Sequence, residues 1–250
     1  MGRADDMRFA DLTFDDFRRL ATDSTLSAYE KIGFPDEYRA GYEPAIFADI
    51  VGKLPPLDGR DQVVVDIGPG CSGLPVLLRE HCEQRGHALL LVDSEEMLAH
   101  HPDGGRVRKF AGRFPDCPEL LAEFAGRVDA ILAYSVLHYV HPRHSVDEFL
   151  DAATGLLAHG GHMLIGDIPN WSKRRRFFSS PAGREFHRAF TGSDEPPELT
   201  ADETAPHIDD AVVLGLVARA RAAGCDAHVV PQADSLPMAN RREDLRVSRP

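Results

Sequence analysis

The sequence has little of several features that would place a protein in a simple class. Its 250 residues include only four cysteines, and no two of these form a C-x-x-C pair. This excludes a disulfide scaffold and a cysteine-rich zinc module. No hydrophobic run is long enough to cross a membrane, and the N-terminus is acidic, unlike a signal peptide. We therefore expect a reduced, cytoplasmic protein with no membrane partner.

Basic residues are also in the minority. The 28 lysines and arginines are outnumbered by 40 acidic residues, which gives a net charge of −12 at pH 7. Such a balance argues against a general nucleic-acid binder and against a protein that lies on a membrane surface. Hydrophobic residues make up 43% of the chain, which is enough for an ordinary core. The length fits one α/β domain with an additional segment.

From residue 62 onward, strand-like and helix-like segments alternate. Short β-branched or leucine-rich runs predict strands over 62–67, 88–92, 107–111, 128–133, 162–166, 226–231 and 244–248. Helices are predicted between them, over about 72–85, 116–125, 144–158 and 208–223, with a further helix opening after Asp93. Strands that alternate with helices predict a doubly wound α/β fold with a mostly parallel sheet.

The most informative stretch follows the first predicted strand. Residues 66–73 read D-I-G-P-G-C-S-G, and the glycines let the backbone come close to a ligand. The string satisfies the dinucleotide fingerprint G-x-G-x-x-G, but Asp66 stands at the mouth of the loop, where a carboxylate suits a cationic centre better than a pyrophosphate. The D-x-G-x-G form resembles motif I of class I methyltransferases. Their cofactor, S-adenosylmethionine (SAM), carries a sulfonium and an ammonium group.

The resemblance covers about residues 62–248 and implies a domain organisation. In this family the sheet has seven strands, the last of which is inserted antiparallel, and N-terminal helices cap the active site. We therefore expect a helical cap over 1–60. A SAM-binding domain would follow over 61–250, with a lid insertion at about 168–207, where the alternation of strands and helices is interrupted.

The same resemblance implies which residues hold the cofactor. Asp93 lies at the end of the second predicted strand, where it would accept hydrogen bonds from both ribose hydroxyls. Met97 would lie near the adenine. The full set of cofactor-binding residues that we predict is Asp66, Gly68, Pro69, Gly70, Asp93, Ser94, Met97, Asp116 and Tyr134.

Candidate catalytic residues follow the fourth predicted strand. Residues 134–139 read Y-S-V-L-H-Y and occupy the motif IV position, where the acceptor meets the methyl group. We predict catalytic roles for Tyr134, His138 and Tyr139, with His138 either a structural histidine or a base for an attacking hydroxyl or amine. Histidine recurs at every third residue over 138–144, but a proline interrupts the run and no cysteine or acid completes a zinc site, so we predict no metal.

A local excess of positive charge follows the fifth predicted strand. Four consecutive cations occupy 173–176, and an arginine pair precedes the last strand. Because arginine can bind carboxylate or phosphate through two nitrogens, these segments predict a pocket for an anionic group. The alternative is a solvated lid whose cations pair with Glu185, Glu243 and Asp244. The predicted substrate-binding residues are Asp167, Asn170, Lys173, Arg174, Arg175, Arg241 and Arg242.

Taken together, the sequence predicts SAM-dependent O- or N-methylation of a small anionic metabolite. The acceptor would attack the SAM methyl group in line, and positioning and desolvation would supply most of the rate. Three alternatives stay open. They are a nicotinamide-dependent oxidoreductase, a SAM-binding partner protein without catalysis, and a methyltransferase that acts on protein or RNA, for which the lack of a broad basic surface weighs against RNA.

Overall fold

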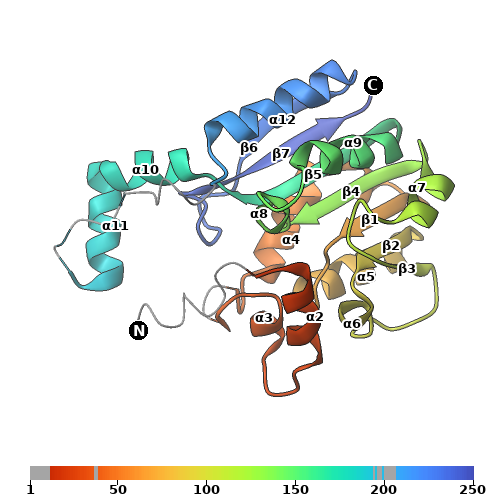
Figure 1. Ribbon diagram of the computed structural model, residues 1–250, viewed down its shortest axis with the longest axis horizontal. Helices are drawn as coiled ribbons and strands as arrows, with labels where there is room; N and C mark the ends of the chain where they lie inside the picture. Colours follow the sequence, from red (N-terminus) through yellow and green to blue (C-terminus); the bar gives the residue numbers. More distant parts are fainter. Residues whose placement is uncertain (1–11, 37–38, 194, 196–198, 200–206) are drawn as a thin grey trace.

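The computed structural model describes residues 12–36, 39–193, 195, 199 and 207–250. A seven-stranded sheet in the order β3-β2-β1-β4-β5-β7-β6 forms its centre (Figure 1). Neighbouring strands from β1 to β5 are parallel, whereas β7 is antiparallel to both β5 and β6. The predicted seven-stranded α/β fold is confirmed, and β7 makes the sheet mixed. The strands are β1 (Val63–Ile67), β2 (Ala88–Asp93), β3 (Val107–Ala111), β4 (Val128–Tyr134), β5 (Leu157–Pro169), β6 (Asp226–Pro231) and β7 (Arg242–Ser248).

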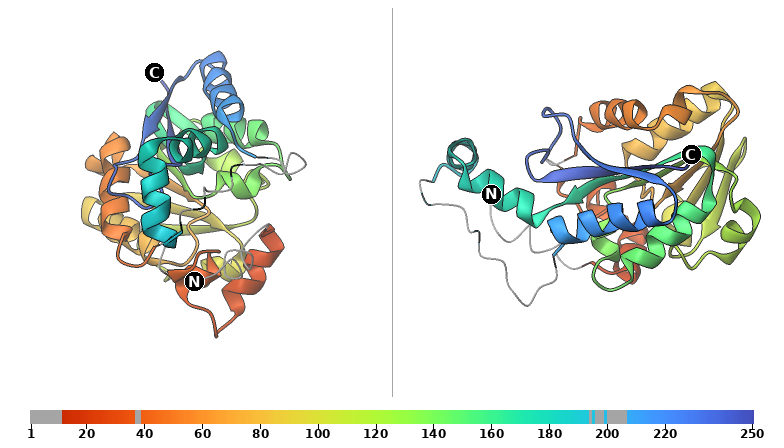
Figure 2. Two further views of the ribbon diagram at one scale, coloured as in Figure 1. Left: turned by 90° about the vertical axis from the view of Figure 1, so that its left-hand side faces the viewer. Right: turned by 90° about the horizontal axis from the view of Figure 1, so that it is seen from above.

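Helices cover both faces of the sheet (Figure 2), which explains why the central strands are mostly apolar. Leu78 and Leu216 are buried in the two separate core clusters, one on each face. The first face is covered by α4 (Glu43–Lys53), the 3₁₀ turn η2 (Pro55–Asp58) and α5 (Gly73–Arg85). The second face is covered by α7 (Pro118–Phe124), α9 (Val146–Leu156) and α12 (Asp210–Ala222).

Strand β5 begins earlier than the sequence predicts. The sequence predicts a helix over about 144–158 and a strand from 162, but α9 ends at Leu156 and β5 starts at the next residue. Gly160 has a φ of +78°, and the pairing between β4 and β5 shifts register between Val128 and Ala130. A Cβ atom at Gly161 would lie 2.7 Å from the carbonyl oxygen of Val128. The two glycines therefore allow a β-bulge where β4 and β5 pair.

Further helices lie outside the two main layers. In the predicted lid, Asn170 and Ser180 accept hydrogen bonds from the backbone at Lys173 (3.0 Å) and Gly183 (3.1 Å), and so cap two successive helices. These two helices project from one side of the sheet in Figure 1. The boundaries of the predicted cap and lid stay predictions, and residues 1–11, 37–38, 194, 196–198 and 200–206 lie outside the described part. The additional helices are α2 (Phe14–Thr22), α3 (Ala28–Lys31), α6 (Glu95–Leu98), α8 (Leu137–Val140), α10 (Trp171–Ser179) and α11 (Pro181–Thr191).

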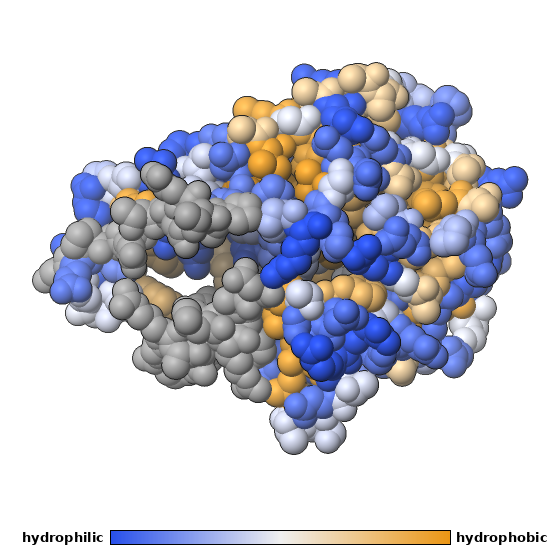
Figure 3. Space-filling model, in the orientation of Figure 1, coloured by the Kyte–Doolittle hydropathy of each residue, from blue (hydrophilic) through white to orange (hydrophobic). Residues whose placement is uncertain are grey.

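The surface in the view of Figure 1 is mostly hydrophilic. Figure 3 shows an apolar band between the hydrophilic surface of the N-terminal helices and that of the elements above them. None of the helices in the described ranges combines the length and the hydrophobicity that crossing a membrane requires.

Candidate functional site

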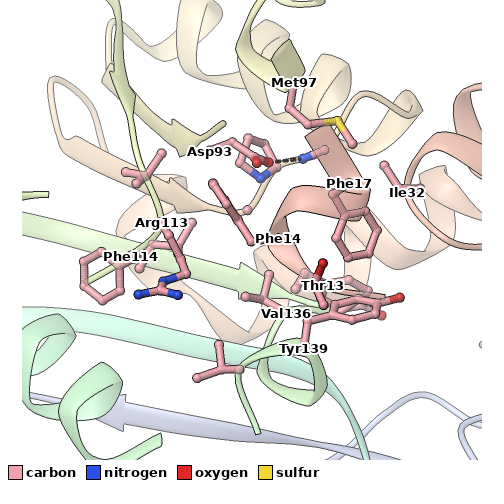
Figure 4. A pocket seen from close by; sticks show the side chains of 18 of the residues that line it. Thr13, Phe14, Phe17, Ile32, Asp93, Met97, Arg113, Phe114, Val136 and Tyr139 are labelled. Carbon is pink, nitrogen blue, oxygen red and sulfur yellow. Dashed lines mark hydrogen bonds between the residues drawn. The ribbon is translucent and has the colours of Figure 1, made fainter. Parts of the chain in front are cut away.

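A first cavity, with a volume of about 310 Å³, lies at the carboxyl ends of β1, β2 and β4. Ligand pockets in doubly wound folds occupy this edge of the sheet, and this volume is within their usual range. The walls come from the glycine loop after β1, the end of β2, the loop after β3, helix α8 and the N-terminal helix α2 (Figure 4). Its lining is largely hydrophobic, with a few charged and hydroxyl groups.

The glycine loop forms one wall of the cavity. Gly68 and Gly70 have φ angles of +68° and +64°, which disfavour any residue with a Cβ atom. A Cβ atom would also lie 2.7 Å from a methyl group of Val136 at the first position and 2.5 Å from one of Ile32 at the second. Pro69 lines the cavity between them. The loop therefore needs glycine both for its backbone conformation and for close packing.

Two carboxyl groups lie beside this loop. The Asp93 carboxylate lines the cavity and accepts hydrogen bonds from the backbone N–H groups of Gly70 (3.2 Å) and Ser94 (2.7 Å). Burial raises the pKa of Asp93 to about 6, although these two bonds act in the opposite direction. Asp66 is buried and is not among the residues that line the cavity. Burial, together with the charge of Asp93, raises the pKa of Asp66 to about 8.

Three further residues that were predicted to bind the cofactor have different surroundings. Met97 lines the cavity (Figure 4). Ser94 is buried, and its side chain caps α6 by accepting a hydrogen bond from the N–H of Met97 (3.2 Å). Asp116 lies outside the cavity, where it is exposed and forms an ion pair with Arg113 (2.5 Å). Arg113 and Phe114 line the cavity in its place.

The three candidate catalytic residues do not all line the same cavity. Tyr139 lines the first cavity together with Val136, three residues earlier, and Tyr134 lines it from the end of β4. His138 instead lines a second cavity, because neighbouring residues of a helix point in different directions. The structure thus departs from the expectation that all three side chains face one site.

Burial dominates the protonation of these three groups. It raises the pKa of Tyr139 to about 12 and that of Tyr134 well above its usual value. Burial and the nearby charge of Arg242 lower the pKa of His138 to about 3. Around neutral pH, both phenols and this imidazole are therefore uncharged, so the tyrosines can offer hydroxyl hydrogen bonds to a ligand.

The N-terminal segment contributes residues that the sequence did not indicate. Phe14 and Phe17 of α2 line the cavity, as does Phe34 after α3 (Figure 4 shows the first two). Arg39 lines it as well, and its guanidinium lies 4.4 Å from the ring centre of Phe34. The abundance of aromatic residues between 9 and 34 was the one available signal, and nothing in the sequence pointed to Arg39.

Asp167 is enclosed by charged and polar partners. Its Oδ2 accepts hydrogen bonds from Arg39 (2.7 Å), from Arg242 (2.9 Å) and from the Ser135 hydroxyl. Burial alone would raise the pKa of this carboxyl group, but the two arginines outweigh it and keep the pKa below its usual value. We predicted that Asp167 binds substrate. The structure instead places it in an internal ion-pair cluster, where its charge is already matched.

Asn170, another predicted substrate residue, is also engaged within the protein. Its side chain caps α10 and donates hydrogen bonds to Asp210 (2.8 Å) and Glu243 (2.6 Å). Only 1% of its surface is exposed, although it lies at the wall of the second cavity. These contacts show that Asn170 fixes the start of the lid helix.

The four consecutive cations point in different directions because they lie on helix α10. Lys173 donates to the carbonyl oxygen of Arg242 (2.6 Å), and Arg176 forms an ion pair with Asp210. Arg175 is exposed. Of the four residues, the second cavity is lined by Arg174, which joins the two arginines at 241 and 242. The four cations therefore do not form one binding site: two bond to other groups of the protein, one is exposed to solvent and one lines the second cavity.

No metal site is evident in the described ranges, because no three histidine, cysteine, aspartate or glutamate side chains come together as ligands there. The histidines at 138 and 141 line the second cavity, whereas His144 lines the first and contacts Arg113 (2.8 Å). The regular spacing in the sequence therefore does not gather the three imidazoles at one point.

Comparison with known proteins yields matches among solved structures. No protein-family model matches the chain, and no curated protein matches it. The N-methyltransferase NodS from Bradyrhizobium japonicum, solved with S-adenosylhomocysteine (SAH), has a TM-score of 0.54 at 14% identity, over 95% of this chain and 98% of that one. A chain from the complex that contains the Haloferax volcanii Trm112 methyltransferase activator has a TM-score of 0.60 at 15% identity, over 94% of this chain and 98% of that one.

A third match covers a smaller share of the solved chain. The CurJ carbon methyltransferase has a TM-score of 0.55 at 14% identity, over 98% of this chain and 66% of that one. These likenesses extend over nearly all of the present chain, and the antiparallel β7 between β5 and β6 is the strand arrangement that the family resemblance implies. The chain therefore has the fold of the class I SAM-dependent methyltransferases.

Proposed function

We propose that the protein transfers a methyl group from SAM to an oxygen or nitrogen atom of a small anionic molecule. The observation that carries the proposal is the first cavity with its glycine loop and with Asp93 at the end of β2. Asp93 lines this cavity and Asp66 is buried behind the glycine loop; the pKa values of both carboxyl groups are raised, and a cationic ligand in the cavity would favour their ionised forms. The similarity in fold to NodS, which was solved with SAH, supports the same cofactor.

The chemistry of the lining residues fits this cofactor. Asp93 offers a carboxylate that can accept hydrogen bonds from the two ribose hydroxyls, while one of its oxygens stays bonded to the N–H of Gly70. Met97 and Phe114 offer apolar surface for the adenine. The backbone of the glycine loop leaves room for the amino-acid end of the cofactor, because a Cβ atom is absent at Gly68 and Gly70.

The cofactor, when bound, supplies a methyl group on a sulfonium, which is already a good electrophile. The protein then has to hold the acceptor in line and to exclude water. Phe17 and Val136 present apolar surface to the cavity, and the hydroxyls of Tyr134 and Tyr139 can orient an acceptor. Neither tyrosine is ionised near neutral pH, since burial raises the pKa of both phenols, so neither is available to accept a proton from the acceptor. We therefore infer an acceptor atom that needs little help in losing a proton.

Calorimetric titration with SAH tests the cofactor assignment. We expect the wild-type protein to bind SAH and Asp93→Ala to bind it about tenfold or more weakly, because charge-assisted hydrogen bonds are worth about 1.5–3 kcal/mol each. Asp116→Ala is the matched control, since it removes an exposed carboxylate outside the cavity and should leave the affinity unchanged. Unchanged SAH affinity in folded Asp93→Ala would refute this role of Asp93.

The nicotinamide alternative and the non-catalytic alternative need separate experiments. A ligand that binds the folded state raises the melting temperature, so SAH should stabilise the protein and NAD should not. Incubation with labelled SAM and a bacterial metabolite extract should give a labelled small product that mass spectrometry identifies. If SAH binds but no extract gives a labelled product, the result favours the alternative in which this chain binds SAM as a partner protein and does not catalyse methyl transfer.

A further inference from the structure

A second cavity lies next to the first and is not explained by cofactor binding. Its volume is also about 310 Å³, and it lies between helix α8, the start of α10, the residues just before α12 and the loop that leads into β7. Trp171 forms part of its wall, and the ring of His207 stacks on this tryptophan with ring centres 5.0 Å apart. The cavity is thus built from four segments that are far apart in the sequence.

The lining of this cavity is strongly basic. Three arginines and three histidines contribute to it, and no acidic residue is among the lining residues that the structure describes. Arg242 is paired with Asp167. The guanidinium of Arg174 lies 4.7 Å from the ring centre of Trp171, and Arg241 reaches the wall from the loop before β7. In a protein with a net charge of −12, such a group of cations at a cavity favours an anionic ligand.

Two of the histidines have a nitrogen atom without a partner. In the described part of the chain, Nδ1 of His138 and Nε2 of His207 are shielded from solvent and make no hydrogen bond. A buried polar atom that lacks a partner costs free energy, and a bound ligand can remove that cost. Both residues line the second cavity, whose wall also contains the three arginines.

The two cavities share a wall. Arg242, which lines the second cavity, donates to Asp167, and the same carboxylate oxygen accepts a hydrogen bond from Arg39, which lines the first. One carboxylate between two guanidinium groups therefore separates the sites. A small molecule held by its anionic group in the second cavity would lie beside the cavity assigned to the cofactor.

We propose that the second cavity binds the anionic group, a carboxylate or a phosphate, of the molecule that receives the methyl group. Arg174 and Arg241 supply the charge, and the unpaired nitrogens of His138 and His207 supply further hydrogen bonds. The assignment to the methyl acceptor rests on the proposed function. The binding of an anion does not, and it can be measured by itself.

Trp171 provides a built-in probe, because it is the only tryptophan in the sequence. Inorganic phosphate is titrated into the protein at constant ionic strength, with chloride as the reference anion, while tryptophan emission is recorded. We expect a saturable change with phosphate that chloride does not produce. In Arg241→Gln the phosphate affinity should fall by about tenfold or more, since a charge-assisted hydrogen bond is lost. A parallel titration with acetate separates a preference for carboxylate from one for phosphate.

The matched control is Arg175→Gln, which removes an exposed guanidinium from the same helix as Arg174 and should bind phosphate like the wild type. SAH calorimetry on each variant reports both its folding and the state of the cofactor site. If SAH binds but neither anion gives a response beyond chloride, the inference is wrong and the proposed function stands. Equal phosphate affinity in Arg241→Gln and the wild type would also overturn it. If anions bind but SAH does not, the assignment to a methyl acceptor fails along with the proposed function.

Discussion

Replacing Asp66 by asparagine tests whether the carboxyl group beside the glycine loop is held in an unfavourable environment. Asp66 lies within the buried part of β1 and exposes only 4% of its surface. Loss of hydration is the largest influence on this group, and the charge of Asp93 adds to it, so that the pKa of Asp66 rises to about 8. Asparagine has nearly the same shape and no charge, so Asp66→Asn removes the cost of ionisation.

The magnitude follows from the change in pKa between the unfolded and folded states. Because the folded value is raised, the contribution of Asp66 to stability is fully present below pH 3.8 and is lost as the pH rises towards about 8. A shift of this size corresponds to at most about 5–6 kcal/mol, at about 1.4 kcal/mol for each pH unit. We expect Asp66→Asn to be more stable than the wild type at the upper end of this range, by several kcal/mol at most, and to lose this advantage at the lower end.

Urea unfolding at a series of pH values, without ligand, measures the effect. The quantity of interest is the difference in free energy of unfolding between Asp66→Asn and the wild type, which should increase with pH. Asp116→Asn is the control, because this carboxylate is exposed and paired only at the surface, so its difference should stay small. A difference for Asp66→Asn that does not change with pH would show that the carboxyl group ionises without penalty, and would refute the reasoning.

Three further predictions concern the neighbourhood of the two cavities. Asp167→Ala should lower the free energy of unfolding by about 3–5 kcal/mol in urea titration, because it leaves two buried guanidinium groups without their carboxylate; a loss below 1 kcal/mol would contradict the role of this cluster. Gly68→Ala should cost about 1–3 kcal/mol, and Val136→Ala in the same chain should restore part of this, because the new methyl group would meet Val136 at 2.7 Å. In NMR titration the imidazole of His138 should not change its protonation between about pH 5 and 8, since burial and Arg242 lower its pKa to about 3; a midpoint in that range would contradict the burial.

The sequence was sufficient for the order of the seven strands from residue 62 onward and for the helices α5, α6, α7, α9 and α12 between them, whereas α8, α10 and α11 were not predicted. Strands such as β1 and β2 are covered on both faces, so each is a short apolar run that ends in an acid, and such runs can be recognised without tertiary information. Gly68 and Gly70 were predictable for a similar reason, because a backbone with positive φ leaves few other choices. Asp93 was recognised from its place at the end of a strand.

The partners of charged groups were decided by the tertiary structure. The four cations at 173–176 are consecutive in the sequence, but a helix turns successive side chains by about 100°, so they reach a carbonyl group, a cavity, the solvent and an acid. Arg39 meets Asp167 across 128 positions of the chain. Local patterns report which surfaces of an element are apolar, because burial repeats with the period of the helix or strand. A pairing between two single charges has no such period, so only the folded chain shows that Asp167 is bound by arginines of the protein itself.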